Sequence, residues 1–148
     1  MFSVVPATSD DVEQLAELLG LLFAQEADFS PDRMRQERGL RLILEQPKSG
    51  GIFCVREGRR VLGMVNVLFT ISTAEGNRVA WLEDLVVHPE YRGKGIGRSL
   101  LLHAIRAAKG AGCSRITLLT DDSNARAMRL YQSEGFNRSR MIVFRKAL

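Results

Sequence analysis

The sequence has little cysteine and no long apolar run. Cys54 and Cys113 are the two cysteines among 148 residues. Neither stands in a Cys-x-x-Cys or Cys/His spacing, so the pattern favours reduced core thiols and indicates no metal site. No stretch approaches the roughly 18 apolar residues of a membrane-spanning helix, and no signal-peptide pattern is found. These absences predict a cytoplasmic protein without a membrane partner.

Extreme composition, low-complexity segments and internal repeats are also missing. Hydrophobic residues make up 45% and charged residues 26% of the chain, as in ordinary globular domains. The length suits one domain spanning residues 1–148. The net charge is +4, but lysine and arginine are scattered along the chain, so we do not expect nucleic-acid binding.

Hydrophobic periodicity and turn residues predict the element order β, α, α, β, β, β, α, β, α, β. Pro31 fits the first position of the second helix, with Ser30 as its cap. The predicted strands lie at 2–6, 52–55, 61–71, 79–87, 115–120 and 141–144, and the predicted helices at 12–22, 31–45, 96–110 and 124–134. Antiparallel strands followed by βαβα units indicate a mixed α/β sheet with helices on its faces.

The stretch from residue 79 onward predicts a strand, a glycine loop and a helix. Residues 79–87 form an apolar run interrupted by Glu83 and Asp84. Three glycines and two cations then occupy residues 92–97, directly before apolar residues at helical spacing. The first turn of a helix has unpaired backbone N–H groups and the positive end of the helix dipole, and glycine lets an anion come close to them. This junction is therefore typical of a diphosphate site.

The loop spacing matches neither a P-loop nor a dinucleotide fingerprint. It does match Arg/Gln-x-x-Gly-x-Gly, as Arg92-x-x-Gly95-x-Gly97. Downstream, residues 124–136 read Asn-x-x-Ala-x-x-Leu-Tyr-x-x-x-Gly-Phe. With both motifs in this order, the chain resembles the GNAT superfamily of acetyl-CoA-dependent N-acetyltransferases over roughly residues 3–146.

The resemblance implies the GNAT acyl-CoA N-acyltransferase fold, an α/β fold with a mixed, mostly antiparallel sheet and helices on both faces. The fourth and fifth strands of this fold splay apart, and acetyl-CoA enters the gap. The short remainder after Phe136 implies a shortened terminal hairpin. The implied cofactor-binding residues are the backbones of Leu85 and Val87, the side chain of Asn124, and the diphosphate loop formed by Arg92, Gly93, Lys94, Gly95, Ile96 and Gly97. Asn124 could equally be a helix cap.

Acetyl transfer to an amine needs a base for the amine and an acid for the leaving thiolate. Glu83 is the predicted base, because alternation would place residues 81, 83, 85 and 87 on one strand face and Asp84 on the other. Burial there would raise its pKa toward neutrality. The alternative is that these acids pair with Arg78 or Arg115. Tyr131, by family resemblance, is the predicted general acid, unless it is only a core aromatic.

The Glu83-Asp84-Leu85 run resembles family members that acetylate polyamines and other small amines. We therefore expect acetyl transfer to the primary amine of a small molecule. The predicted acceptor-binding residues are Glu26, Phe29, Trp81 and Asp84, with Asp28 and Phe23 beside them. Acetylation of a protein or peptide amine and a non-catalytic acyl-CoA-binding module are the alternatives. Homodimers are common in the family, but no sequence feature requires one. We expect His88 in a turn and His103 on an exposed helix face.

Overall fold

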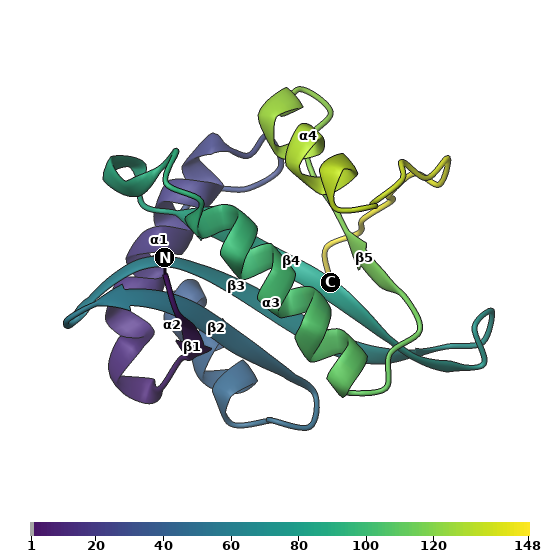
Figure 1. The fold of residues 1–148 in the computed structure, drawn as a ribbon, viewed down its shortest axis with the longest axis horizontal. Helices are drawn as coiled ribbons and strands as arrows, with labels where there is room; N and C mark the ends of the chain where they lie inside the picture. The colour runs from purple at the N-terminus through teal and green to yellow at the C-terminus, as the bar shows by residue number, and fades with distance from the viewer. Residues whose placement is uncertain (1) are drawn as a thin grey trace.

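The computed structural model describes residues 2–148 and contains a five-stranded sheet in the order β1-β2-β3-β4-β5 (Figure 1). The strands are β1 (Val4–Pro6), β2 (Gly50–Glu57), β3 (Arg60–Ser72), β4 (Asn77–Val87) and β5 (Ile116–Leu118). The helices are α1 (Val12–Gln25), α2 (Arg33–Leu44), α3 (Ile96–Gly110) and α4 (Ala125–Ser133), with short 3-10 turns at Ser9–Asp11 and Pro89–Tyr91. The first three pairings are antiparallel and the β4–β5 pairing is parallel.

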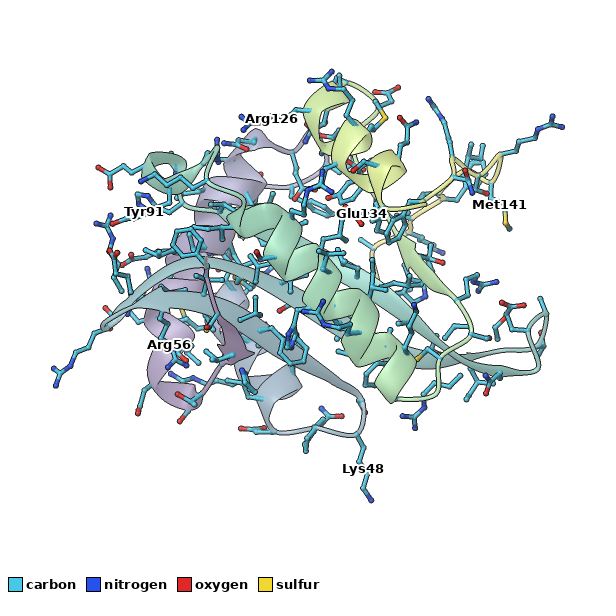
Figure 2. The ribbon with its side chains drawn as sticks, viewed as in Figure 1. Lys48, Arg56, Tyr91, Arg126, Glu134 and Met141 are labelled. Atoms are coloured by element: carbon cyan, nitrogen blue, oxygen red, sulfur yellow. The ribbon has the colours of Figure 1, made fainter. Side chains whose placement is uncertain are left out.

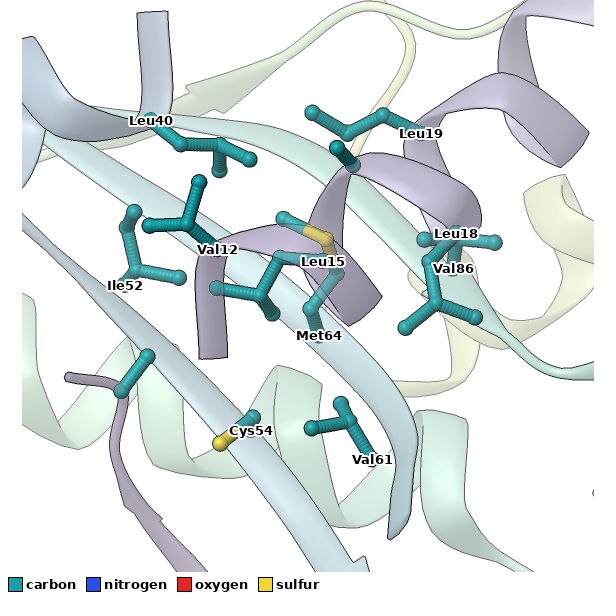
Figure 3. Close-up of a cluster of buried hydrophobic side chains, with 12 residues drawn as sticks. Val12, Leu15, Leu18, Leu19, Leu40, Ile52, Cys54, Val61, Met64 and Val86 are labelled. Atoms are coloured by element: carbon teal, nitrogen blue, oxygen red, sulfur yellow. The ribbon is translucent and has the colours of Figure 1, made fainter. Parts of the chain in front are cut away.

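Helices cover both faces of the sheet, as the sequence predicts. Leu15 of α1 and Leu40 of α2 pack with Met64 of β3 in one buried cluster (Figure 3). Leu100 of α3 packs with Val65 of β3 in a second cluster on the opposite face. Successive strand residues point to opposite faces, so the apolar run of β3 fills both clusters.

Helix α2 begins two residues later than the sequence predicts. Asp32 is its N-cap, and the Asp32 carboxylate accepts a hydrogen bond from the Arg35 N–H at 3.1 Å. The Gln36 side chain accepts from the Asp32 N–H at 2.7 Å, which closes the turn from the other side. Asp and Ser are comparable N-caps, but the reciprocal bonds between Asp32, Arg35 and Gln36 start the helix just after Asp32. The predicted Ser30 cap and Pro31 start are therefore wrong.

The predicted last strand at 141–144 is not formed. These residues are exposed and have no regular structure, and Met141 points away from the body of the protein (Figure 2). The segment is instead drawn toward the α1–α2 connection, where Arg145 forms an ion pair with Asp28 at 2.8 Å. β5 is itself limited to Ile116–Leu118, so it offers little backbone for a further strand to pair with.

Candidate active site

A bulge in β4 determines where its two acidic residues point. Met64 pairs with Val86 and Asn66 pairs with Glu83, so β4 has two residues, Asp84 and Leu85, where β3 has one. Asp84 takes the bulge in a left-handed conformation with φ of 57°. Aspartate is one of the few non-glycine residues that tolerates this region. An extra residue in a strand reverses the alternation of side chains beyond it.

The predicted common face for residues 81, 83, 85 and 87 is therefore wrong. Ala80 and Leu82 pack in the cluster under α3 before the bulge, and Leu85 and Val87 pack in that same cluster after it. Trp81 and Glu83 consequently lie on the other face, toward α1 and α2. Trp81 is half-buried, whereas the Glu83 side chain is exposed.

Asp84 is the half-buried carboxylate of this strand. One of its oxygens accepts a hydrogen bond from the Asn66 side-chain amide at 2.7 Å. Burial, with the Glu83 charge as a smaller cause, raises the pKa of Asp84 to about 6, although the Asn66 hydrogen bond lowers it. Burial disfavours the charged form of a carboxyl group. Asp84 therefore changes its protonation state close to neutral pH.

Asn66 is a site residue that sequence reasoning missed. It lies in the middle of β3, is 2% exposed, and follows an unbroken apolar run. Asparagine is depleted in strands, and a buried amide needs hydrogen-bond partners. A lone asparagine inside such a run was the available signal.

Glu26 follows directly after α1 and shares the electrostatic environment of Asp84. Burial raises the pKa of Glu26 to about 7, and the charges of Asp84 and Asp121 raise it further, whereas Arg145 lowers it. Asp121 is a second residue that sequence reasoning missed. Its carboxylate accepts a hydrogen bond from the Ala27 N–H at 3.4 Å, which ties the loop after β5 to the end of α1.

Tyr131 of α4 completes this group of titratable side chains. It is partly buried and packs edge-on against Phe136 with 6.0 Å between ring centres. Burial, and the Glu26 charge after it, raise the pKa of Tyr131 to about 12. The charge of Glu26 thus couples to both Asp84 and Tyr131. The structure brings these three predicted site residues together, with Glu83 exposed on the neighbouring position of β4.

The parallel pairing of β4 with β5 stops beside this group. Its pairs are Ala80 with Ile116, Trp81 with Thr117, and Leu82 with Leu118. Beyond Leu82, β4 continues to Val87 without β5 as its neighbour, which is the splay that the family resemblance implies. The backbones of Leu85 and Val87 lie in this unpaired part of β4. The Val87 carbonyl also accepts a hydrogen bond from the Arg92 side chain at 3.2 Å.

The glycine loop that follows depends on positive backbone angles. Gly93 has φ of 78°, and Gly95, the N-cap of α3, has φ of 86°. Glycine alone adopts this region without strain. Ile96 is 1% exposed, so its side chain belongs to the core and only its backbone N–H can serve a ligand. Gly97 lies in the first turn, where an added Cβ would stand 3.7 Å from Val87.

The cations around the glycine loop differ in whether they already have an ion-pair partner. Arg92 and Lys94 are exposed, and the Lys94 ammonium lies 5.0 Å above the Tyr91 ring. Arg98 is paired with Glu134 at the end of α4 (Figure 2) and donates to the Ser133 hydroxyl at 3.2 Å. Open positive-φ glycines, free helix N–H groups and exposed cations fit a diphosphate group.

Asn124 is the N-cap of α4. Its side-chain oxygen accepts a hydrogen bond from the Ala127 N–H at 3.1 Å. The capping alternative is therefore confirmed, and a contact with cofactor through the side-chain NH₂ stays a prediction.

The acidic and aromatic residues predicted to hold an amine lie together, and the chain places its own cation among them. The rings of Phe23 and Phe29 are 5.6 Å apart. The Arg145 guanidinium lies 5.3 Å above Phe29 and bonds to Asp28. Glu26 belongs to this neighbourhood, because Arg145 and Asp28 both act on its pKa.

Other features lie apart from the group around Asp84. A groove of about 600 Å³ between α1, α2 and the start of β3 contains none of the three titratable residues. His88 accepts a hydrogen bond from the Glu90 N–H at 3.3 Å, in the turn that the sequence predicts. His103 is half-buried against Phe53 at 4.5 Å rather than exposed, because α3 presents it to β2. Within residues 2–148, no cluster of three metal-ligating side chains occurs, and no helix is long and apolar enough to cross a membrane.

Known proteins resemble this chain in both sequence and fold. The acetyltransferase (GNAT) family matches residues 13–136. Thialysine N-epsilon-acetyltransferase of Bos taurus is 40% identical over 53% of this chain and 46% of its own length. Aminoalkylphosphonate N-acetyltransferase of Salmonella typhimurium is 30% identical over 96% of this chain and 88% of its own length. A crystal structure of a transcriptional regulator from Bacillus halodurans is 27% identical, with a TM-score of 0.83 over 99% of this chain and all of that one.

The extent of these matches differs between relatives. The chain spans about half the length of several curated relatives that it matches, whereas the family match covers both motifs and the residues between them. The chain therefore belongs to the acetyltransferase (GNAT) family, as its two motifs predict.

Proposed function

We propose that this protein transfers the acetyl group of acetyl-CoA directly to the primary amine of a small molecule. One observation carries the proposal. Three titratable groups with raised pKa values, Asp84, Glu26 and Tyr131, are coupled through the charge of Glu26. Asp84 lies just beyond the last β4–β5 pair, and the glycine loop follows the end of the same strand. Titratable groups with such shifts, grouped beside a ligand loop, are typical of an active site.

The residues that would hold acetyl-CoA lie along one path. The N–H groups of residues 93–97, with Arg92 and Lys94, would bind the diphosphate, and the unpaired edge of β4 at Leu85 and Val87 would bind the pantetheine amides as an added strand would. Asn124 would contribute its side-chain NH₂ from the start of α4. When bound, acetyl-CoA supplies the thioester that donates the acetyl group.

The amine must lose a proton before it attacks, since an alkyl ammonium has an ordinary pKa near 10. We assign the base to Asp84, with Glu26 as the second carboxylate of the site, because their pKa values of about 6 and about 7 suit proton transfer near neutral pH. Glu83, the base that the sequence predicts, stays the alternative. Its exposed side chain could act through a water molecule.

Tyr131 would supply the hydrogen for the leaving sulfur. With a pKa of about 12, its hydroxyl keeps its proton throughout the neutral range and donates a hydrogen bond. The Glu26 charge is one cause of this raised pKa. A bound ammonium or a proton on Glu26 would cancel that charge and make Tyr131 a stronger acid. The acceptor would in this way help to prepare the acid that serves it.

A small cationic acceptor agrees with the surroundings of the site. Glu26, Asp28, Asp84 and Asp121 bring negative charge to the acceptor side, and the relatives with the names given above act on small amines. Trp81 and Phe29 would flank the acceptor. A peptide amine and a non-catalytic acyl-CoA-binding module are the competing functions. A cytoplasmic location, a homodimer and the lack of nucleic-acid binding stay predictions of the sequence.

Calorimetric titration with acetyl-CoA, followed by measurement of thiol release with polyamines, amino acids, aminoalkylphosphonates, amino sugars and peptides, tests this function. Binding with release for one small amine class is the expected result. Binding without release for any amine would favour the regulatory module, and release with peptides alone would favour the protein acetyltransferase. Failure to bind acetyl-CoA would overturn the proposal.

The pH–rate profiles of three matched variants then identify the base. Glu83→Gln, Asp84→Asn and Glu26→Gln each remove one charge with little change of shape. We expect Asp84→Asn to abolish the rising limb of the profile and Glu83→Gln to retain it. The reverse result would restore Glu83 as the base.

A further inference from the structure

Asn66 contacts the proposed base from the neighbouring strand. Its side-chain NH₂ donates a 2.7 Å hydrogen bond to the Asp84 carboxylate. Asn66 pairs in register with Glu83, the residue just before the bulge, so the bond crosses from β3 to the one β4 residue with a left-handed backbone. The bond therefore joins the bulge to the regular strand beside it.

Burying the Asn66 side chain destabilises the folded state, because only part of the amide finds a hydrogen-bond partner. The residue is 2% exposed, and its side-chain oxygen is buried without a hydrogen-bond partner. A buried acceptor without a hydrogen-bond partner destabilises the folded state, because it has lost its water partners without replacing them. A leucine of similar volume would avoid this cost in the stretch of residues 61–67, which is otherwise apolar. The amide is thus an unfavourable choice for folding alone, and its one bonded partner is Asp84.

We propose that Asn66 is a positioning residue that holds the Asp84 carboxylate toward the acceptor side of the site and keeps it ionised when an amine binds. The role of Asp84 as the base comes from the proposed function, whereas the hydrogen bond from Asn66 is independent of it. A hydrogen bond donated to the charged form of a carboxyl group favours that form. The same bond restrains the side chain of a residue whose backbone lies in the left-handed region, with φ of 57°.

The Asn66 hydrogen bond lowers the Asp84 pKa, whereas burial and the Glu83 charge raise it. Glu83 on the same strand acts to keep Asp84 protonated, as does burial. Glu26, which follows α1, is the other carboxylate whose charge couples to Asp84, and its own charged neighbours are Asp28, Asp121 and Arg145. Asn66 favours the ionised form of Asp84 directly, through its hydrogen bond to the carboxylate.

A matched set of variants tests this role. Asn66→Leu removes the donor at similar volume, and Asn66→Thr keeps a hydroxyl donor on a side chain suited to a strand. Gln36→Leu is the control, because Gln36 is also a buried amide, 7% exposed, but donates to the Ala16 carbonyl at 2.9 Å, away from the site. Two readouts are needed: the Asp84 carboxyl pKa by carbon NMR in the protein without substrate, and the pH–rate profile with the acceptor.

We expect Asn66→Leu to raise the Asp84 pKa above about 6 by roughly one unit and to move the rising limb of the profile upward by the same amount. Because the ionised fraction of Asp84 sets the rate, kcat should fall about twofold near pH 7 and approach a tenfold loss only below about pH 5. Asn66→Thr should restore part of both, and Gln36→Leu should change neither. An unchanged Asp84 pKa in Asn66→Leu would overturn the inference, whatever the rates. A raised pKa with an unchanged rate profile would uphold the contact and instead overturn Asp84 as the base.

Discussion

Asp84→Asn should make the protein more stable at neutral pH while removing its activity. The pKa of Asp84 rises from 3.8 to about 6 on folding, and each pKa unit corresponds to 1.36 kcal/mol. The ionised carboxylate therefore costs the folded state about 3 kcal/mol. Asparagine tolerates the left-handed backbone of the bulge and can still accept the Asn66 hydrogen bond. The substitution consequently removes the charge and leaves the shape.

The sign of this effect depends on pH. A carboxyl group whose folded pKa is raised contributes its full stability below the unfolded pKa, and that stability is lost as the pH rises through the folded pKa. The advantage of Asp84→Asn over the parent protein should therefore be smallest near pH 4 and should grow by about 3 kcal/mol up to about pH 7. This corresponds to a rise in Tm of roughly 6–12 °C for a chain of this size.

Urea unfolding of both proteins at several pH values measures this difference. Asp122→Asn is the matched control, because Asp122 is an exposed aspartate in the loop before α4 and should give a constant difference. A constant difference between Asp84→Asn and the parent from pH 4 to pH 8 would refute the reasoning, since the buried charge would then carry no penalty.

Three further predictions concern the other parts of the site. Tyr131→Phe should lower kcat on the order of a hundredfold and leave acetyl-CoA affinity nearly unchanged in calorimetry; a loss confined to affinity would contradict the acid role. Gly95→Ala should lower the free energy of unfolding by about 1–2 kcal/mol because of its φ of 86°, and it should weaken acetyl-CoA binding. Gly110→Ala, whose Cβ also meets open space, should do neither. Equal effects of the two variants in urea unfolding and calorimetry would be inconsistent with this reasoning. Arg145→Ala should raise the Glu26 pKa above about 7 by NMR titration, because a neighbouring cation is lost; a lower pKa would show that Arg145 acts otherwise.

The sequence by itself determined the family, the fold class and the glycine loop. Each of these depends on local spacing: glycine at 93 and 95 is required by positive φ angles, and apolar residues at helical spacing define the buried face of α3. Local geometry of this kind is written into short stretches of chain. Tyr131 lies on α4, the helix that the second motif predicts.

The tertiary structure decided which carboxylates can act. Strand alternation alone predicts one common face for residues 81, 83, 85 and 87. A bulge at Asp84 reverses the alternation beyond it, and the hydrophobic pattern of the sequence does not predict a bulge. Burial raises the pKa values of both Asp84 and Glu26. The Glu26 pKa also responds to the charges of Asp84, Asp121 and Arg145, which are distant in the sequence. Such values depend on groups that only folding brings together, as does the ion pair between Arg145 and Asp28 that joins the tail to the α1–α2 connection.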